Sequence, residues 1–231
     1  MAKAISLITL QGTFDGLTFV KSRTYGDHVR AARGTRKKAE LNAACLEQSK
    51  RLVKSNVPAQ IIRGAINPYR KDFFHGQLWQ KLVSLTNEQL DNDAMFDFSR
   101  LKPFEVHIKY PLSRLAHITT STTVDATLSK LQVTAIIDMP LVFDDSLAVD
   151  GFRVGIIVVY PDMETQSATT EVAYSKIMGL TEKVEPLYME FSIPSSAKSF
   201  LVFVRIDGCK NGEVHVALAA KGMRMAVAGR V

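Results

Sequence analysis

The sequence predicts an α+β protein, with an N-terminal β-hairpin and helices followed by an antiparallel β-sandwich of immunoglobulin-like or jelly-roll-like type. Two patterns predict it. Apolar residues recur at helical spacing between residues 36 and 85, whereas many short strand-like runs with no helix between them fill residues 104–228. We therefore expect a basic hairpin-and-helix segment over residues 1–93 and the sandwich domain over residues 94–231.

The first β-unit is expected from three short runs rich in apolar and β-branched residues, at 4–10, 17–22 and 28–32. Glycine-bearing turns at 11–16 and 25–27 separate them, and glycine adopts positive φ without steric cost. A hairpin by itself is only marginally stable in water, so this unit should pack on something else.

A basic helix is expected over residues 36–55, with Thr35 as its N-cap. Leu41, Cys45 and Leu52 recur at the spacing of one helix face, which makes Cys45 a candidate core residue. Pro58 should end this helix, because proline disfavours α geometry in the residue before it.

Two further helices are expected at 59–65 and 69–85. The second carries an aromatic cluster formed by Phe73, Phe74 and Trp79. So small a helical segment cannot easily bury them all, so we expect these aromatics to dock on the sandwich or on another subunit.

Eight strands are expected in the second half, each bounded by turn residues such as Asp150-Gly151 and Asn211-Gly212. Residues 155–159 are continuously apolar apart from the glycine, which indicates a central strand buried on both faces. The expected strands cover residues 104–108, 116–123, 131–137, 153–160, 170–175, 187–193, 200–206 and 213–220, the last continuing to residue 228.

Positive charge is concentrated in the first third of the chain. Residues 1–81 hold 15 Lys and Arg against 5 Asp and Glu, a net charge of +10, while residues 82–231 hold 14 against 18, a net charge of −4. Such asymmetry indicates contact with an anionic or acidic partner. The residues expected to make that contact are Lys21, Arg23, Arg30, Arg33, Arg36, Lys37 and Lys38.

No pattern in the sequence indicates catalysis. The five histidines lack metal-ligand spacing, the aspartate pairs fall in expected loops, and neither cysteine lies in a nucleophile motif. Cys209 falls in an expected turn, where we expect it to be exposed. We therefore expect a non-enzymatic protein with no catalytic residue, metal or other cofactor.

The N-terminal pattern Gly12-x3-Gly16-Leu-Thr-Phe-Val-Lys21, followed by His28-Val29-Arg30 and a basic helix, resembles an uncharacterised protein family common in Bacteroidota. Those proteins combine a glycine-bearing hairpin, a basic helical segment and a C-terminal β-rich domain, here with counterparts at 155–160 and 200–208. Leu17 stands where the family has Asn. The resemblance implies this architecture and supplies no catalytic residue.

These observations lead us to expect a structural or assembly protein, such as a phage-virion-like component or a subunit of another bacterial assembly. Its basic N-terminal arm would dock on further copies or on other assembly subunits. The alternative is a nucleic-acid-binding protein that uses the same basic segment. A ligand-binding sandwich is a third possibility, and it would need exposed aromatics among Tyr160, Tyr174 and Tyr188.

We expect the protein in the cytoplasm or incorporated into an assembled particle. The apolar start of the chain is short and lacks a cleavage pattern, so we expect no signal peptide. No apolar run approaches the roughly 18 residues of a membrane span.

Overall fold

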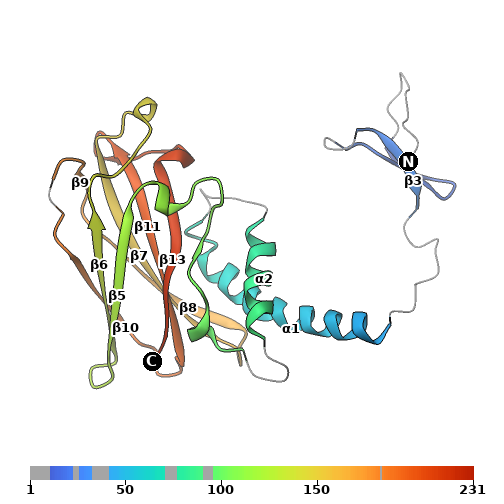
Figure 1. Cartoon of the computed structure of the whole chain (residues 1–231), viewed down its shortest axis with the longest axis horizontal. Helices are drawn as coiled ribbons and strands as arrows, with labels where there is room; N and C mark the ends of the chain where they lie inside the picture. The colour runs from blue at the N-terminus through green and yellow to red at the C-terminus, as the bar shows by residue number, and fades with distance from the viewer. Residues whose placement is uncertain (1–10, 23–25, 33–41, 71–76, 91–95, 183) are drawn as a thin grey trace. The chain divides into compact units, whose positions relative to one another are not determined.

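A computed structural model of the chain describes residues 11–22, 26–32, 42–70, 77–90, 96–182 and 184–231 (Figure 1). The α+β class with a β-sandwich is confirmed. The chain divides into two compact units, residues 1–47 and residues 48–231. This division falls well before the boundary expected at residue 93, because the helices between the two positions pack on the sandwich.

The N-terminal unit contains a three-stranded antiparallel sheet, which we call the N-terminal sheet. Its strands are β1 (Gly12–Phe14), β2 (Leu17–Val20) and β3 (His28–Ala31), in the order β1-β2-β3. The second and third strands were predicted, but residues 12–14 are a strand where a turn was expected. Asp15 and Gly16 both have positive φ in the two-residue turn, as a tight hairpin requires. The strand expected at 4–10 lies outside the described residues.

Helix α1 is one helix of 24 residues, Ala43–Ile66, and Pro58 lies inside it. The prediction that this proline ends the helix was wrong. Proline costs about 3 kcal/mol inside a helix, but the turns after it bury Ala59, Ile62 and Ile66 completely, which offsets that cost. The backbone N–H of Cys45 donates to the Asn42 side chain at 2.8 Å. The predicted cap, Thr35, lies outside the described residues.

Helix α2 (Leu78–Gln89) lies against α1. Its Leu78 and Leu82 are buried, and the buried Thr86 hydroxyl donates to the Ser55 carbonyl of α1 at 2.9 Å. The Arg51 guanidinium of α1 donates to the carbonyl of Asn87 at 2.8 Å. These contacts hold the two helices together as one layer.

Two antiparallel sheets form the sandwich. The small sheet has the order β10-β6-β5, and the large sheet has the order β4-β13-β11-β7-β8, with β12 pairing β11 and β9 pairing β7. The strands are β4 (Phe104–Glu105), β5 (His117–Asp125), β6 (Lys130–Asp138), β7 (Gly151–Asp162), β8 (Ser167–Tyr174), β9 (Met178–Gly179), β10 (Leu187–Ser192), β11 (Ser199–Lys210), β12 (Glu213–Val214) and β13 (Lys221–Arg230).

All eight expected strand regions contain strands, although several ends are displaced. The last region is not one strand, because the short β12 is followed by a 3-10 turn, Leu218–Ala220, before β13 begins. The two-residue β9 was missed, since two residues carry no periodic pattern. Short 3-10 turns also lie at Phe98–Arg100, Leu112–Arg114 and Asp145–Leu147.

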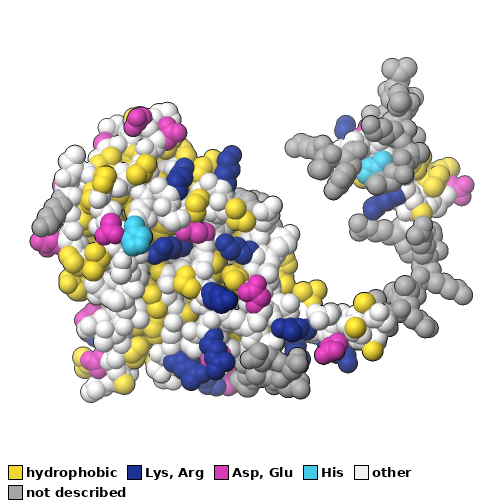
Figure 2. All heavy atoms as spheres, viewed as in Figure 1, with side chains coloured by type: hydrophobic (Ala, Val, Ile, Leu, Met, Phe, Trp, Pro, Cys, Tyr) yellow, Lys and Arg dark blue, Asp and Glu magenta, His cyan; other side chains and the backbone are white. Residues whose placement is uncertain are grey.

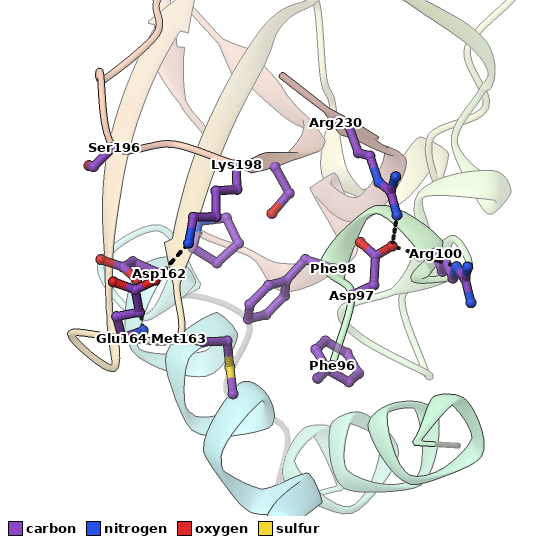
Figure 3. Close-up of a pocket in the computed structure, with 12 residues that line it drawn as sticks. Phe96, Asp97, Phe98, Arg100, Asp162, Met163, Glu164, Ser196, Lys198 and Arg230 are labelled. Atoms are coloured by element: carbon purple, nitrogen blue, oxygen red, sulfur yellow. Dashed lines mark hydrogen bonds and ion pairs between the residues drawn. The ribbon is translucent and has the colours of Figure 1, made fainter. Parts of the chain in front are cut away.

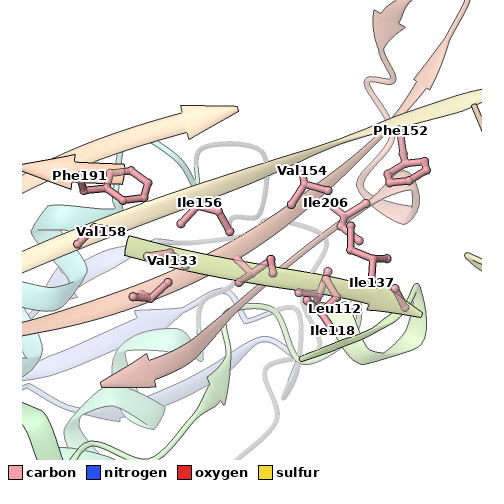
Figure 4. Close-up of a cluster of buried hydrophobic side chains, with 14 of the residues drawn as sticks. Leu112, Ile118, Val133, Ile137, Phe152, Val154, Ile156, Val158, Phe191 and Ile206 are labelled. Carbon is pink, nitrogen blue, oxygen red and sulfur yellow. The ribbon is translucent and has the colours of Figure 1, made fainter. Parts of the chain in front are cut away.

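The large sheet is buried on both faces, as predicted for residues 155–159. On one face, Ile156 and Val158 of β7 join the core between the two sheets (Figure 4). On the other face, Ile157 and Val159 join a second core, which includes Ile62 of α1 and other residues of the helical layer. The molecule from residue 48 onward is therefore three-layered: small sheet, large sheet, helices (Figure 1).

A buried charged cluster, formed by Asp207, Arg205 and Arg153, links strands of the large sheet. Asp207, only 1% exposed, accepts from Arg205 Nε at 2.7 Å and from Arg153 Nε at 3.1 Å. Arg205 also donates to the carbonyl of Tyr69, just after α1. The Arg153 guanidinium lies 4.4 Å from the ring centre of Tyr174. The cluster thus joins strands β7, β8 and β11 to the end of the helix.

Asp207→Asn should lower the free energy of unfolding by about 3–5 kcal/mol, because it removes the carboxylate from two partly or fully buried guanidinium groups. Chemical denaturation followed by circular dichroism measures the change. Glu164→Gln is the matched control, since its ion pair with Lys198 at 2.6 Å is exposed and should contribute little. Equal effects of the two substitutions would contradict a structural role for the cluster.

Candidate functional site

The N-terminal sheet is amphipathic. Strand register places Thr13, Thr18 and Arg30 together on one face, and the hydroxyls of the two threonines lie 3.0 Å apart. The opposite face holds only glycine and apolar residues. Its apolar residues are Phe14, Leu17, Phe19, Val29 and Ala31.

The three strands of the sheet do not cover this apolar face. Phe14 is 79% exposed and Leu17 is 47% exposed. None of the described residues between 11 and 32 is buried, so the sheet has no core of its own. Such a sheet is too small to be stable in isolation, and its apolar face is a candidate contact surface. The alternation of Leu17 and Phe19 in the sequence is the signal that could have predicted it.

The expected basic contact residues are only partly within the described chain. Lys21 and Arg30 are both exposed, at the end of β2 and in β3 respectively. The other five, Arg23, Arg33, Arg36, Lys37 and Lys38, lie outside the described residues.

Of the expected docking aromatics, Phe73 and Phe74 lie outside the described residues. Trp79 is half-buried in α2 and packs against the core between the helices and the large sheet. The Arg63 guanidinium of α1 lies 5.5 Å from its ring centre. Trp79 therefore packs at least in part against this chain's own second core.

A pocket of about 380 Å³ lies at the end of the sandwich where β7 and β13 finish (Figure 3). Phe96, Phe98 and Met163 supply its apolar lining. Its charged residues pair with one another: Lys198 lies 2.6 Å from Glu164, and Arg230 lies 2.6 Å from Asp97. The pocket therefore combines an apolar lining with charges that are already neutralised.

Asp97 is the most constrained carboxylate of this pocket. It accepts from the hydroxyl and the backbone N–H of Ser99 at 2.6 and 3.0 Å, and from Arg230. Hydrogen bonds from Ser99 and Arg230 lower the pKa of the Asp97 carboxyl to about 2. This carboxylate stays ionised at neutral pH and is suited to fixing the loop, not to proton transfer.

A second concavity, which we call the acidic groove, lies on the sandwich between residues 137–140 and residues 180–182 and 184. Its volume is about 730 Å³. It is lined by Ile137, Asp138, Met139, Pro140, Leu180, Thr181, Glu182 and Val184. Neither segment stood out in the sequence, because the groove arises only where they meet.

Among the described residues, His107 and His117 have separate hydrogen-bond partners. His117 Nδ1 lies 2.7 Å from Asp138 Oδ2 on the exposed end of the small sheet, while the buried His107 accepts from the backbone of Tyr110 at 3.0 Å. Among the described residues, no group of three or more His, Cys, Asp or Glu side chains is arranged to hold a metal ion.

The two cysteines are placed opposite to expectation. Cys45 is exposed, and Cys209 is completely buried in β11. Burial raises the pKa of the Cys209 thiol, which disfavours the reactive thiolate. The turn that was expected to contain Cys209 begins only after Lys210, because β11 continues to that residue.

The three tyrosines considered for ligand binding differ in environment. Tyr160 is buried, and burial raises the pKa of its hydroxyl. Tyr174 packs on Gly155, where an added Cβ would lie 2.6 Å from the ring. Tyr188 alone among them is largely exposed, at 77%, and it stands beside Thr134 on the outer face of the small sheet. One exposed ring does not make an aromatic platform.

Comparison with known proteins finds no match to a family model, to a curated protein or to a solved structure. The resemblance to the Bacteroidota family therefore stays a prediction. Within the described parts of the chain, no helix has the length and apolar character needed to cross a membrane.

Asp97→Asn should make the free energy of unfolding depend less on pH between about pH 4 and pH 2. Because the folded pKa lies below the usual 3.8, the ionised group stabilises the fold above about pH 4, and this contribution is lost as the pH falls towards 2. We expect Asp97→Asn to lower the free energy of unfolding by about 2 kcal/mol at pH 6 and by much less at pH 2. Urea denaturation across that range measures this, with the exposed-loop variant Asp145→Asn as control; a loss independent of pH would contradict the assignment.

Proposed function

We propose that this protein is a structural subunit of a multi-subunit assembly and that its N-terminal unit docks on a neighbouring copy. The rigid body is the sandwich with its helical layer, and the docking element is the N-terminal sheet. The observation that carries the proposal is the apolar face of that sheet, which its own three strands leave uncovered.

The energetics of that face favour association. A large apolar side chain contributes about 1.5–3 kcal/mol when it moves from water into a fully buried environment. Phe14 and Leu17 are exposed enough to gain a large part of this on docking. Ordering the interface and losing freedom of movement oppose the gain, so contact over several side chains is required.

The beginning of α1 adds a second exposed apolar surface. No residue from 42 to 54 is buried, although Leu46, Leu52 and Val53 are large apolar side chains. An isolated helix of this length is marginal in water. Contact with a neighbouring subunit would stabilise both this helical stretch and the N-terminal sheet.

The proposal predicts self-association that depends on one face of the N-terminal sheet. Phe14→Ser and Leu17→Ser should each weaken association roughly tenfold or more, because each removes apolar area from the interface. Thr13→Ala and Thr18→Ala, on the opposite face, should change it little. Light scattering coupled to size-exclusion chromatography over a concentration series measures the effect.

Two results would contradict the proposal. One is a wild-type protein that stays monomeric at high concentration. The other is an equal effect of substitutions on both faces. Thermal unfolding of each variant controls for damage to the sandwich.

The basic composition of the first third of the chain supports a second candidate, nucleic-acid binding. Neutralising phosphates releases counterions, so such binding would weaken steeply with salt. Arg36→Glu, Lys37→Glu and Lys38→Glu together should then abolish it while leaving the sandwich folded. Fluorescence anisotropy with single- and double-stranded oligonucleotides at 50 and 200 mM salt measures this; unchanged binding by the triple variant would exclude the basic segment as the contact.

A further inference from the structure

We infer that the free edge of strand β5 pairs with the same edge of a second copy, about a twofold axis at Ser121. The small sheets of the two copies then join into one continuous antiparallel sheet. The contact is isologous, because the same patch is used on both subunits. It does not involve the N-terminal sheet, so it goes beyond the proposed function and holds whether or not that sheet docks on a neighbour.

Strand β5 is the outer strand of the small sheet, because among the described residues it pairs only with β6, beside which it lies in Figure 1. The register shows which backbone groups face its free edge. The N–H of Ile193 donates to the carbonyl of Ser129 at 2.8 Å, so the odd-numbered residues of β6 bond β10. The even-numbered residues of β6 bond the odd-numbered residues of β5. The even-numbered residues of β5 therefore direct their N–H and C=O groups to the free edge.

Four residues of β5 face the edge in this way: Ile118, Thr120, Thr122 and Val124. Arg224 of β13 donates to the carbonyl of Ile118, which agrees with this orientation. A carbonyl oxygen has a second lone pair, so this contact leaves it able to accept again. A row of such N–H and C=O groups is a template for a further strand.

The other edges of the two sheets carry features that hinder pairing. At one end of the large sheet, β4 is only two residues long. On the free edge of β10, the N–H of Ser192 donates to the Glu171 side chain of β8 at 3.1 Å, so these two edge strands contact each other. Strand β5 has nine residues, no proline or lysine, and a register with β6 that contains no bulge. It therefore lacks the usual features that protect an edge strand.

The sequence of β5 reads nearly the same in both directions. It is His-Ile-Thr-Thr-Ser-Thr-Thr-Val-Asp, with Ser121 at its centre. When two copies pair antiparallel about that residue, every Thr lies opposite a Thr, and Ile118 lies opposite the partner's Val124. Pairs of threonines and pairs of β-branched side chains are favourable across antiparallel strands. The strand is thus complementary to a second copy of itself.

The backbone directions fit the same register. About an axis at Ser121, the even-numbered residues of one copy lie opposite the even-numbered residues of the other. The groups that face the edge then meet each other, and each such pair exchanges two hydrogen bonds. A register shifted by one residue would place even-numbered residues opposite odd-numbered ones and leave these groups without partners.

A buried hydroxyl supports this register independently. Thr120 Oγ1 is buried and has no hydrogen-bond partner among the described residues. Leaving a buried hydroxyl unpaired is unfavourable. In the twofold pair, the partner's Thr122 lies directly opposite Thr120 on the same face, where its hydroxyl can donate to that oxygen.

The ends of the strand are also complementary, because His117 lies opposite the partner's Asp125. His117 bonds Asp138 through Nδ1, and Asp125 Oδ1 accepts from the backbone N–H groups of Thr127 and Leu128. The atoms Nε2 of His117 and Oδ2 of Asp125 remain for the contact. Both β5 and β6 carry charged residues only at their ends, and Figure 2 shows few charged side chains along these strands. Like charges therefore do not oppose the pairing.

Cysteine crosslinking of the full-length chain tests the register. Every variant carries Cys45→Ser, because Cys45 is exposed, and keeps the buried Cys209. Ser121→Cys should form an intermolecular disulfide under mild oxidation, because the Cα atoms of such a pair lie about 4.5 Å apart. Thr119→Cys and Thr123→Cys should each fail to crosslink alone, since identical positions lie roughly 14 Å apart along the strand. Mixed together they should crosslink, because these positions face each other; non-reducing gel electrophoresis measures all four samples.

Two results of this experiment would overturn the inference. One is the absence of a disulfide from Ser121→Cys. The other is a disulfide from Thr119→Cys alone that forms as readily as the one from Ser121→Cys, since this would indicate another register or random collision.

The strength of the contact is tested at one position of the edge. Thr122→Pro removes an N–H that faces the edge and does not bond β6, so the strand should tolerate it. It should weaken dimer formation at least tenfold in sedimentation velocity, whereas the control Thr122→Ala keeps the N–H and should weaken it less. Equal dimer formation by Thr122→Pro and wild type would overturn the inference. Circular dichroism and thermal unfolding verify that each variant is folded.

A combined variant separates this contact from the proposed function. Phe14→Ser and Leu17→Ser, added to Ser121→Cys, should leave the crosslink intact. Loss of the crosslink with these substitutions would overturn the inference that β5 pairs without the N-terminal sheet. A crosslinked dimer that never forms larger species would contradict the proposed function and support this inference.

Discussion

The antiparallel ladder between β7 and β11 is the constraint on which the rest of the body depends. Nine consecutive residue pairs, from Gly151–Cys209 to Val159–Leu201, join these strands at the centre of the large sheet. Their side chains alternate between two cores, so one ladder fixes both the small sheet and the helical layer. Burial on both faces leaves no room for a register shift, because a shift of one residue would exchange the two cores. The charged cluster belongs to the same ladder, because Arg205 and Asp207 of β11 alternate with Phe203 on the side that faces the helices.

The helical layer is held by the sandwich more than by its own sequence. Helix α1 passes through Pro58 because the turns beyond it bury Ala59 and Ile62 against the second core. The earlier turns bury no side chain. The helix thus has a half fixed by packing and a half whose apolar side chains face water. That contrast also separates the two units, since the division at residue 47 falls within the exposed half.

The contrast between the units is the basis of the functional proposal. The body from residue 48 onward buries two extensive cores, whereas the N-terminal sheet has an apolar face and no core. For this reason we propose that a neighbouring subunit covers the apolar face of the sheet.

The sequence by itself determined the α+β class, the position of the strands and the burial of residues 155–159, because these follow from local periodicity and turn residues. Tertiary structure alone decided three other features: the continuation of α1 through Pro58, the burial of Cys209 and the existence of the acidic groove. Each depends on contacts between segments distant in the sequence, whose free energy outweighs local preference. The apolar face of the N-terminal sheet lies between these cases: the alternation of Leu17 and Phe19 is local, but only strand register shows that Phe14 and Val29 share its face.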